Sequence, residues 1–179
     1  MEESVMVEDP SLERETDDFE RLFKSHYPMV VRQIMRIISS QSVAEDVAQD
    51  VFLQLYHTDR TGIENLPAWL TKTAINTAYN HVRSEKRYRA RMEKEAHVAS
   101  EFLPSSENKW LEQEDILAVR RILSQMNERD RNLLLMKYSG FSYDELAQAI
   151  QIKKGSVGSL LSRAKKQFQK LYQRRGDGC

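Results

Sequence analysis

Apolar residues recur along almost the whole chain at steps of three and four, and this spacing constrains the fold more than any other feature. It is the repeat of α-helices that bury one side. The sequence has no run in which Val, Thr or Tyr alternates with polar residues, as strands would require. It also has only six Gly and four Pro in 179 residues to interrupt helices. The sequence therefore predicts an all-α fold.

The first helix is expected to begin near Asp17, whose carboxylate can cap it together with Glu20. The apolar residues of this segment continue to Ile38. Pro28 lies inside the segment and is predicted to kink or interrupt the helix, because proline lacks a backbone donor and crowds the preceding turn.

A second helix is predicted to open with a capping box of Ser42 and Glu45 and to run to about His57. A loop is expected over residues 57–66. Pro67 suits the first turn of a third helix, where its missing N–H has no intrahelical partner to lose.

Residues 92–108 lose the helical periodicity and are interpreted as a flexible linker. Helices resume near Trp110. A further helix is expected to be capped by Asn127 and Asp130 and to end at Gly140. The chain is therefore predicted to form two small helical domains, one on each side of the linker.

The segment from Ser142 to Tyr172 has the pattern of a DNA-binding helix-turn-helix. A capping box of Ser142 and Glu145 precedes a short helix, and the turn QIKKGS leads into a second one. The apolar side of this second helix repeats Val157, Leu161, Ala164, Phe168 and Leu171. Its other side offers Ser159, Ser162, Arg163 and Lys166. A small, cationic helix of this kind fits a major groove, although an ordinary helical hairpin with a solvated basic side has the same pattern.

The chain carries 27 basic and 27 acidic residues, but the charges are segregated. Residues 1–20 hold nine acids and one base, whereas residues 83–91 hold five bases and one acid. Residues 153–175 hold eight bases and no acid. The two basic segments suit nucleic acid. The acidic leader is interpreted as a disordered tail, with masking of the basic surfaces as the alternative.

Cys179 is the only cysteine, so an internal disulfide or a thiolate zinc site is excluded. The N-terminus lacks the apolar block of a secretory signal. The best apolar run begins at Met29 and is broken by Arg32 and Arg36, so it cannot span a bilayer. These features predict a cytoplasmic chain with no membrane insertion, no metal and no cofactor.

The predicted second helix has a feature that its core does not explain. Its buried side is expected to contain Val43, Ala44, Val47, Ala48, Val51, Phe52 and Leu55. On the opposite side, Leu53 lies among Asp46, Gln49 and Asp50. An exposed leucine ringed by carboxylates and an amide indicates a protein contact, although a single exposed leucine can also have no role.

Six residues of the predicted third helix fall on one stripe at steps of three and four. They are Trp69, Thr73, Asn76, Asn80, Arg83 and Arg87, and the other side carries Leu70, Ala74, Ala78 and Val82. An aromatic ring can stack on bases, amides can read base edges and arginines can neutralise phosphates, so the stripe suits unpaired nucleic acid. The alternative is that Trp69 packs inward and the remainder is a solvated polar surface.

Three motifs in this order resemble one family: AEDVAQDVFLQLY, AWLTKTAINTAYNHVR and SYDELAQAIQIKKGSVGSLLSRAKKQF. They are similar to regions 2 and 4 of bacterial sigma factors. More narrowly, they resemble the extracytoplasmic-function class, which lacks regions 1 and 3. The resemblance covers about residues 17–172. It implies an acidic disordered leader (1–16), region 2 (17–91), a linker (92–108), region 4 (109–173) and a tail (174–179).

The resemblance also implies partners and site residues. Core RNA polymerase would be bound through Asp46, Gln49, Asp50 and Leu53. The stripe from Trp69 to Arg87 would recognise and open the minus-ten element of promoter DNA, and the loop 57–66 would hold a flipped base. The minus-thirty-five element would be read by Lys153, Lys154, Ser156, Ser159, Ser162, Arg163 and Lys166. An anti-sigma factor is a further partner that the class leaves open.

The chain departs from the family pattern at several positions. Family members usually carry Asp where Asn80 stands. Residues 155–161 resemble the usual family pattern G-T-V-K-S-R-L. In this chain Gly158 stands in place of the Lys, and Leu160 stands in place of the Arg. Gln151 stands where a turn Gly is common, so a positive φ there would be mildly strained. Binding to the upstream element is therefore expected to be weaker or differently specified.

An enzyme is not predicted. The four histidines lack the HExxH spacing of a metal site, and the GSVG run is too short for a phosphate loop. Two other classes of function remain open. One is a helix-turn-helix regulator that dimerises and binds a palindrome without being a polymerase subunit. The other is a helical RNA-binding or adaptor protein.

Overall fold

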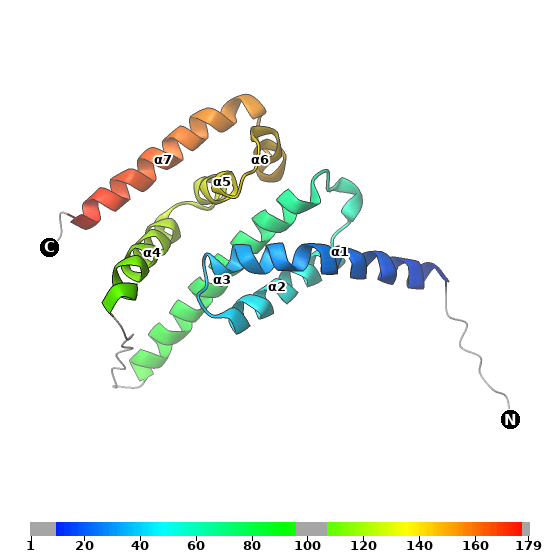
Figure 1. Ribbon diagram of the computed structural model, residues 1–179, viewed down its shortest axis with the longest axis horizontal. Helices are drawn as coiled ribbons and strands as arrows, with labels where there is room; N and C mark the ends of the chain where they lie inside the picture. Colours follow the sequence, from blue (N-terminus) through cyan, green and yellow to red (C-terminus); the bar gives the residue numbers. More distant parts are fainter. Residues whose placement is uncertain (1–9, 96–106, 177–179) are drawn as a thin grey trace.

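The structure, a computed structural model, describes the backbone of residues 10–95 and 107–176 and the side chains of residues 18–92 and 114–174. Over this part of the chain it contains helices and no strand, which confirms the predicted all-α fold. The helices are α1 (Pro10–Met35), α2 (Gln41–Tyr56), the 3-10 helix η1 (Arg60–Gly62), α3 (Leu66–Glu95), α4 (Glu107–Gln125), α5 (Glu128–Tyr138), α6 (Tyr143–Ile150) and α7 (Lys154–Gly176) (Figure 1).

The helices α1, α2 and α3 pack pairwise against one another and form the first of two groups (Figure 1). The apolar side of α2 is buried as its spacing predicts, through Ala44, Val47, Ala48, Val51, Phe52 and Leu55, with Val43 half-buried. Val30 and Ile34 of α1 and Leu70 of α3 are fully buried against it. Burial of each large aliphatic side chain contributes roughly 1.5–3 kcal/mol, so this group has a hydrophobic core of its own.

The first helix begins earlier than predicted and is not interrupted by proline. It starts at Pro10, so residues 10–16 are helical rather than part of a disordered leader, and Asp17 is not its cap. Residues 1–9 lie outside the described residues. Pro28 lies within the continuous helix. Proline has no N–H to donate to the carbonyl of Lys24, but both residues are exposed, so this loss occurs at the surface. Water can satisfy that oxygen, while half-buried Phe23 and Tyr27 before the proline and buried Val30 and Ile34 after it hold the helix against the core.

The caps of α2 and α3 also differ from the predicted ones. Ser40, not Ser42, is the N-cap of α2, and its side chain accepts from the backbone N of Val43 at 3.5 Å. For α3, Asn65 Oδ1 accepts from the backbone N of Ala68 at 2.9 Å. Pro67 therefore lies in the first turn, as predicted.

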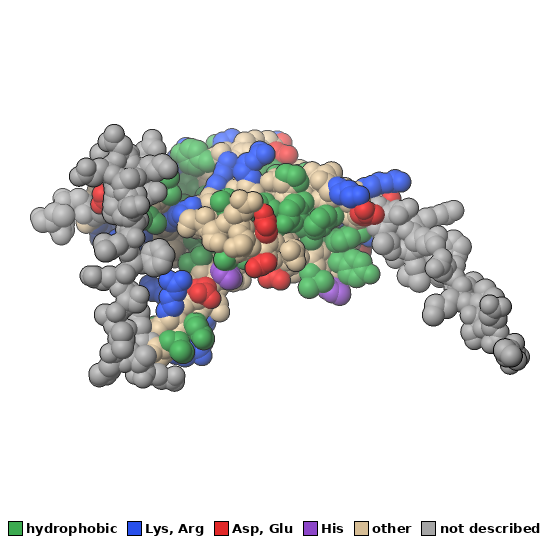
Figure 2. Space-filling model, turned by 60° about the horizontal axis from the view of Figure 1, so that its bottom comes forward, with side chains coloured by type: hydrophobic (Ala, Val, Ile, Leu, Met, Phe, Trp, Pro, Cys, Tyr) green, Lys and Arg blue, Asp and Glu red, His purple; other side chains and the backbone are tan. Residues whose placement is uncertain are grey.

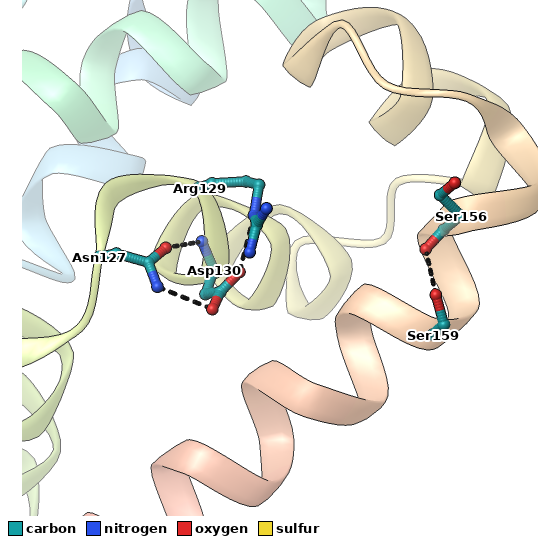
Figure 3. Close-up of polar contacts among 5 residues, drawn as sticks. All are labelled: Asn127, Arg129, Asp130, Ser156 and Ser159. Atoms are coloured by element: carbon teal, nitrogen blue, oxygen red, sulfur yellow. Dashed lines mark hydrogen bonds and ion pairs between the residues drawn. The ribbon is translucent and has the colours of Figure 1, made fainter.

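The helices α4, α5, α6 and α7 form the second group, in which α7 packs against each of the other three. Asn127 caps α5 as predicted. Its Oδ1 accepts from the backbone N of Asp130 at 2.9 Å, and its Nδ2 donates to Asp130 Oδ2 at 2.8 Å (Figure 3). Arg129 Nε donates to the other carboxylate oxygen of Asp130 at 2.9 Å. Both oxygens of this buried carboxylate are thereby paired.

The predicted turn signals of the second group are confirmed. Gly140, with φ 96°, follows the end of α5. Ser142 and Glu145 form the capping box of α6. Gln151 ends α6 with φ 58° and ψ 50°, the left-handed conformation that was predicted to be strained for a residue other than Gly.

The two groups lie against each other along α3, which contacts α5 and α6 as well as α1 and α2. Ile75 and Tyr79 of α3 are consequently buried, in addition to the core side that the sequence predicts. The predicted linker 92–108 is too long at both ends, because α3 continues to Glu95 and α4 begins at Glu107. Residues 96–106 lie outside the described residues.

Candidate nucleic-acid interface

The outer side of α2 is arranged as its spacing predicts. Asp46, Gln49 and Asp50 are exposed, and Leu53 is 57 % exposed among them. Tyr56, one turn further along, is 64 % exposed, and the sequence analysis did not single it out. Figure 2 brings forward the lower side of Figure 1 and shows red carboxylates next to green apolar side chains there. An apolar centre with a charged rim is typical of a protein contact.

The stripe on α3 changes character along its length. Trp69 is half-buried and packs against the core, and Thr73 and Asn76 are also half-buried. Asn80, Arg83 and Arg87 are exposed. The spacing correctly predicted the shared side of the helix, and Trp69 packs inward at its start, as the alternative interpretation of the stripe expected. The first half of the stripe lies under the second group of helices.

Asn76 is held by two residues of α5. Its Nδ2 donates to Glu128 Oε1 at 3.0 Å, and its Oδ1 accepts from Asn132 Nδ2 at 2.8 Å. The amide that the sequence assigns to base reading is therefore paired within the protein. A base could replace these partners only if α5 moved away.

The loop between α2 and α3 also contacts the second group. Gln148 Nε2 donates to Glu64 Oε2 at 2.9 Å, and Asn65 Nδ2 donates to Glu145 Oε1 at 3.2 Å. A pocket of about 440 Å³ lies between this loop and α6, with Trp69 in its wall. Its volume and its mixed polar and aromatic lining suit a small planar group.

The outer side of α7 exposes most of the residues predicted to read duplex DNA. Lys153, Lys154, Ser159, Ser162, Arg163 and Lys166 are exposed, and Ser156 is half-buried. Lys154 Nζ lies 2.8 Å from a carboxylate oxygen of Asp144, which partly compensates its charge. Ser159 Oγ donates to the carbonyl of Ser156 at 3.0 Å (Figure 3), which leaves the Ser159 oxygen free to accept from a base.

The two substituted positions of α7 have different surroundings. Leu160 is only 8 % exposed and belongs to the core around α7, so this position contributes packing here. Gly158 lies at the edge of the outer side, where an added Cβ would lie 3.7 Å from Cε2 of Tyr143. This is an ordinary contact, so a side chain can be accommodated at position 158.

A buried polar cluster between α3 and α5 was missed by the sequence analysis. It consists of Tyr79, Arg131 and Asn132, each at most 2 % exposed. Burial raises the pKa of the Tyr79 hydroxyl to about 12, and burial lowers the pKa of the Arg131 guanidinium. Arg131 and Asn132 stand in a charged stretch that reads as surface, so no local signal could have revealed them.

Two further searches were confined to the part of the chain that the structure describes. None of its helices is long and apolar enough to cross a membrane. It contains no group of three or more His, Cys, Asp and Glu side chains placed to hold a metal ion.

Comparison with known proteins assigns the two groups of helices. Residues 22–88 match the family model for Sigma-70 region 2, and residues 116–168 match the model for Sigma-70, region 4. Together the two matches span more than half of the chain. They fall on α1–α3 and on α4–α7, respectively.

Curated relatives and solved structures agree with these matches. The RNA polymerase sigma-H factor of Pseudomonas aeruginosa is 28 % identical over 87 % of this chain and 86 % of its own. The RNA polymerase sigma factor YlaC of Bacillus subtilis is 22 % identical over 86 % of this chain and 91 % of its own length. The sigma factor RpoE in complex with the anti-sigma factor NepR, from Bartonella quintana, aligns with a TM-score of 0.52 and 23 % identity, over 87 % of this chain and 97 % of RpoE. CnrH in complex with the cytosolic domain of CnrY aligns with a TM-score of 0.56 and 16 % identity, over 89 % of this chain and 90 % of CnrH.

Proposed function

The chain belongs to the sigma-70 family, and from that premise we propose how its helices divide the work of transcription initiation. It is a sigma factor of the extracytoplasmic-function class that directs transcription from promoters. One observation supports this division of roles: the chain contains both a region 2 and a region 4, and each has its own basic surface. Its partners are core RNA polymerase and promoter DNA, in a cytoplasmic setting and without a catalytic role of its own.

Core RNA polymerase binds the outer side of α2. Leu53 supplies the apolar centre of the contact, and Asp46, Gln49 and Asp50 supply a polar rim. Binding removes the Leu53 side chain from water, and this stabilises the complex in proportion to the apolar area that is buried. The exposure of Leu53 and the neighbouring Tyr56 supports this assignment.

The stripe of α3 captures the minus-ten element as a single strand. Trp69 and the loop before α3 take a base, and Arg83 and Arg87 neutralise phosphates. Opening about ten base pairs forfeits roughly 1.4 kcal/mol of stacking per step, about 14 kcal/mol in total. Capture of a base on a protein surface returns about 1–3 kcal/mol, so one or two captured bases are insufficient. The remainder must come from polymerase, which grips the DNA on both sides.

The outer side of α7 reads the minus-thirty-five element as duplex. Arg163 and Lys166 provide charge, and Ser159 and Ser162 are small enough for close approach to a major groove. Lys153 and Lys154 add charge where α7 begins. Because position 158 has no side chain and position 160 is buried, fewer cations face the duplex than in most of the family.

Replacing Gly158 with Lys is expected to steepen the salt dependence of duplex binding. One added phosphate contact increases the slope of log K against log salt by about 0.9. The measurement is a fluorescence titration of the sigma factor with upstream promoter duplex across a range of salt. Gly158→Ala is the matched control, because it also raises helix propensity, by a slightly larger amount, without adding a charge. Equal slopes for the Lys and Ala variants would contradict the placement of position 158 beside the DNA.

An anti-sigma factor is a further proposed partner. It is suggested by two structural neighbours, RpoE bound to the anti-sigma factor NepR and CnrH bound to the cytosolic domain of CnrY. Both neighbours cover most of this chain, including region 2 and region 4.

Run-off transcription tests the proposed function as a whole. The chain and core polymerase are incubated with a promoter library, and the transcripts are sequenced. Discrete transcripts that require both proteins are expected. A regulator that acts without being a polymerase subunit would instead fail to co-elute with core polymerase and would bind a palindromic site unaided.

A further inference from the structure

The surface of α7 that is proposed to read duplex DNA has a gap at one edge. Gly158, which has no side chain, lies in the second turn of α7, next to the exposed Ser159. In a helix-turn-helix, residues near the N-terminus of the second helix contact base edges. The gap at Gly158 is therefore placed where it can affect which bases are read.

Tyr143 of α6 borders this gap. Its ring atom Cε2 lies 3.7 Å from the point that a Cβ on Gly158 would occupy, which is ordinary van der Waals distance. Tyr143 is nevertheless 44 % exposed, so much of its surface faces solvent at the edge of the outer side of α7. An exposed aromatic ring at such a place offers a large apolar area to a partner.

Neighbouring groups hold this ring in place. Tyr143 is the first residue of α6, where the capping box fixes the backbone. The next residue, Asp144, lies 2.8 Å from Lys154 Nζ through its Oδ1, and this ion pair links the start of α6 to the start of α7. Lys137 Nζ lies 5.1 Å from the centre of the Tyr143 ring, within the range of a cation–π contact. A side chain that is already positioned loses little entropy when it binds.

The chemistry of this edge suits an apolar group on a base. Thymine presents a methyl group in the major groove, and apolar side-chain atoms recognise it by direct contact. The ring carbons of Tyr143 supply such atoms, and the missing side chain at position 158 leaves room for a methyl group to approach them. Lys137 adds a positive charge beside the ring, which suits the neighbouring phosphates.

We propose that Tyr143 is a specificity-determining residue for the minus-thirty-five element, and that its ring reads the methyl group of a thymine at the gap left by Gly158. The inference rests on the proposed function of α7. An apolar contact releases no counterion, so it adds base selectivity without adding to the salt dependence of binding.

Substitution of thymidine by deoxyuridine tests the proposal, because deoxyuridine lacks only the methyl group and keeps the base-pairing groups. Each thymine of an upstream promoter duplex from the run-off screen is replaced in turn. Fluorescence anisotropy then measures the affinity of the complex of sigma factor and core polymerase. With the unmodified chain, one thymine should show a loss of about fourfold, the effect of one buried methyl-sized group. Tyr143→Ala should abolish this methyl effect.

Further variants locate the contact. Tyr143→Phe keeps the ring and removes the hydroxyl, so it should preserve the methyl effect. Gly158→Ala adds only a Cβ at ordinary contact distance and should also preserve it. Gly158→Leu fills the gap and should abolish it, and it leaves Tyr143 in place if Tyr143→Ala does not fold. Tyr172→Ala is the matched control, because Tyr172 is 42 % exposed and lies about four turns further along α7.

The outcomes separate the failure of this inference from that of the proposed function. If the double variant Arg163→Ala with Lys166→Ala binds the duplex as tightly as the unmodified chain, the role of α7 is wrong and the inference falls with it. If that variant binds more weakly but no thymine shows a methyl effect, the inference alone is wrong. It is also wrong if the effect persists in Tyr143→Ala or Gly158→Leu, or disappears in Tyr143→Phe or Tyr172→Ala.

Discussion

Replacing Leu53 with Asp is expected to weaken binding to core RNA polymerase by about 30-fold, the effect of losing one central residue of an interface. Leu53 is 57 % exposed, so the change should leave the fold of region 2 intact. In the complex, however, it would place a carboxylate where an apolar side chain is removed from water, beside Asp46 and Asp50. The measurement is a titration of labelled sigma factor with core polymerase, together with a thermal melt of each variant.

The matched control for this prediction is Leu117→Asp. Leu117 lies on α4 and is 55 % exposed, so the two substitutions add the same charge at positions of similar exposure. The control should retain nearly full affinity. Equal loss in the two variants would show that added charge, rather than the α2 surface, determines binding.

The double replacement of Arg83 and Arg87 with Ala is expected to give the largest loss of single-strand binding. Both side chains are exposed on the proposed minus-ten stripe, beyond the part covered by region 4. Loss of two phosphate contacts should reduce the slope of log K against log salt by about 1.4, since each contact to a single strand contributes about 0.7. Affinity at low salt should fall by more than tenfold. The measurement is oligonucleotide binding by the complex of sigma factor and core polymerase.

Lys86→Ala with Arg89→Ala provides the control for the arginine pair. It removes the same charge from the same helix, but these two residues lie away from the stripe on the helical wheel. A uniform electrostatic attraction would give both double variants the same slope. A change confined to the first pair would locate the strand along the stripe.

The helices themselves could be predicted from the sequence because helix formation depends on neighbouring residues. The apolar steps of α2 and α7 and the cap of Asn127 follow from residues within two turns of one another, whereas the turn at Gln151 was expected only from the family pattern. Where nearby alternatives compete, the prediction failed. Ser40 and Ser42 are both suitable caps for α2, and the packing of its buried side selects the earlier one.

The contact between the two regions could not be predicted from the sequence. Asn76 and Tyr79 of α3 meet Arg131 and Asn132 of α5, and more than fifty residues separate them along the chain. In sequence, Arg131 and Asn132 read as solvated polar residues, since burial of such groups depends on a partner surface rather than on local pattern. Exposure of Leu53 and of the α7 cations was predicted correctly because helical periodicity alone decides which side of a helix faces the core.

Permanganate reactivity of promoter thymines tests the central claim most directly, because it reports unpaired bases in the intact complex. A linear promoter duplex found in the run-off screen is incubated with the sigma factor, with core polymerase, or with both. Reactive thymines around the minus-ten element are expected only when both proteins are present. Reactivity with the sigma factor alone, or none with both proteins, would contradict the account.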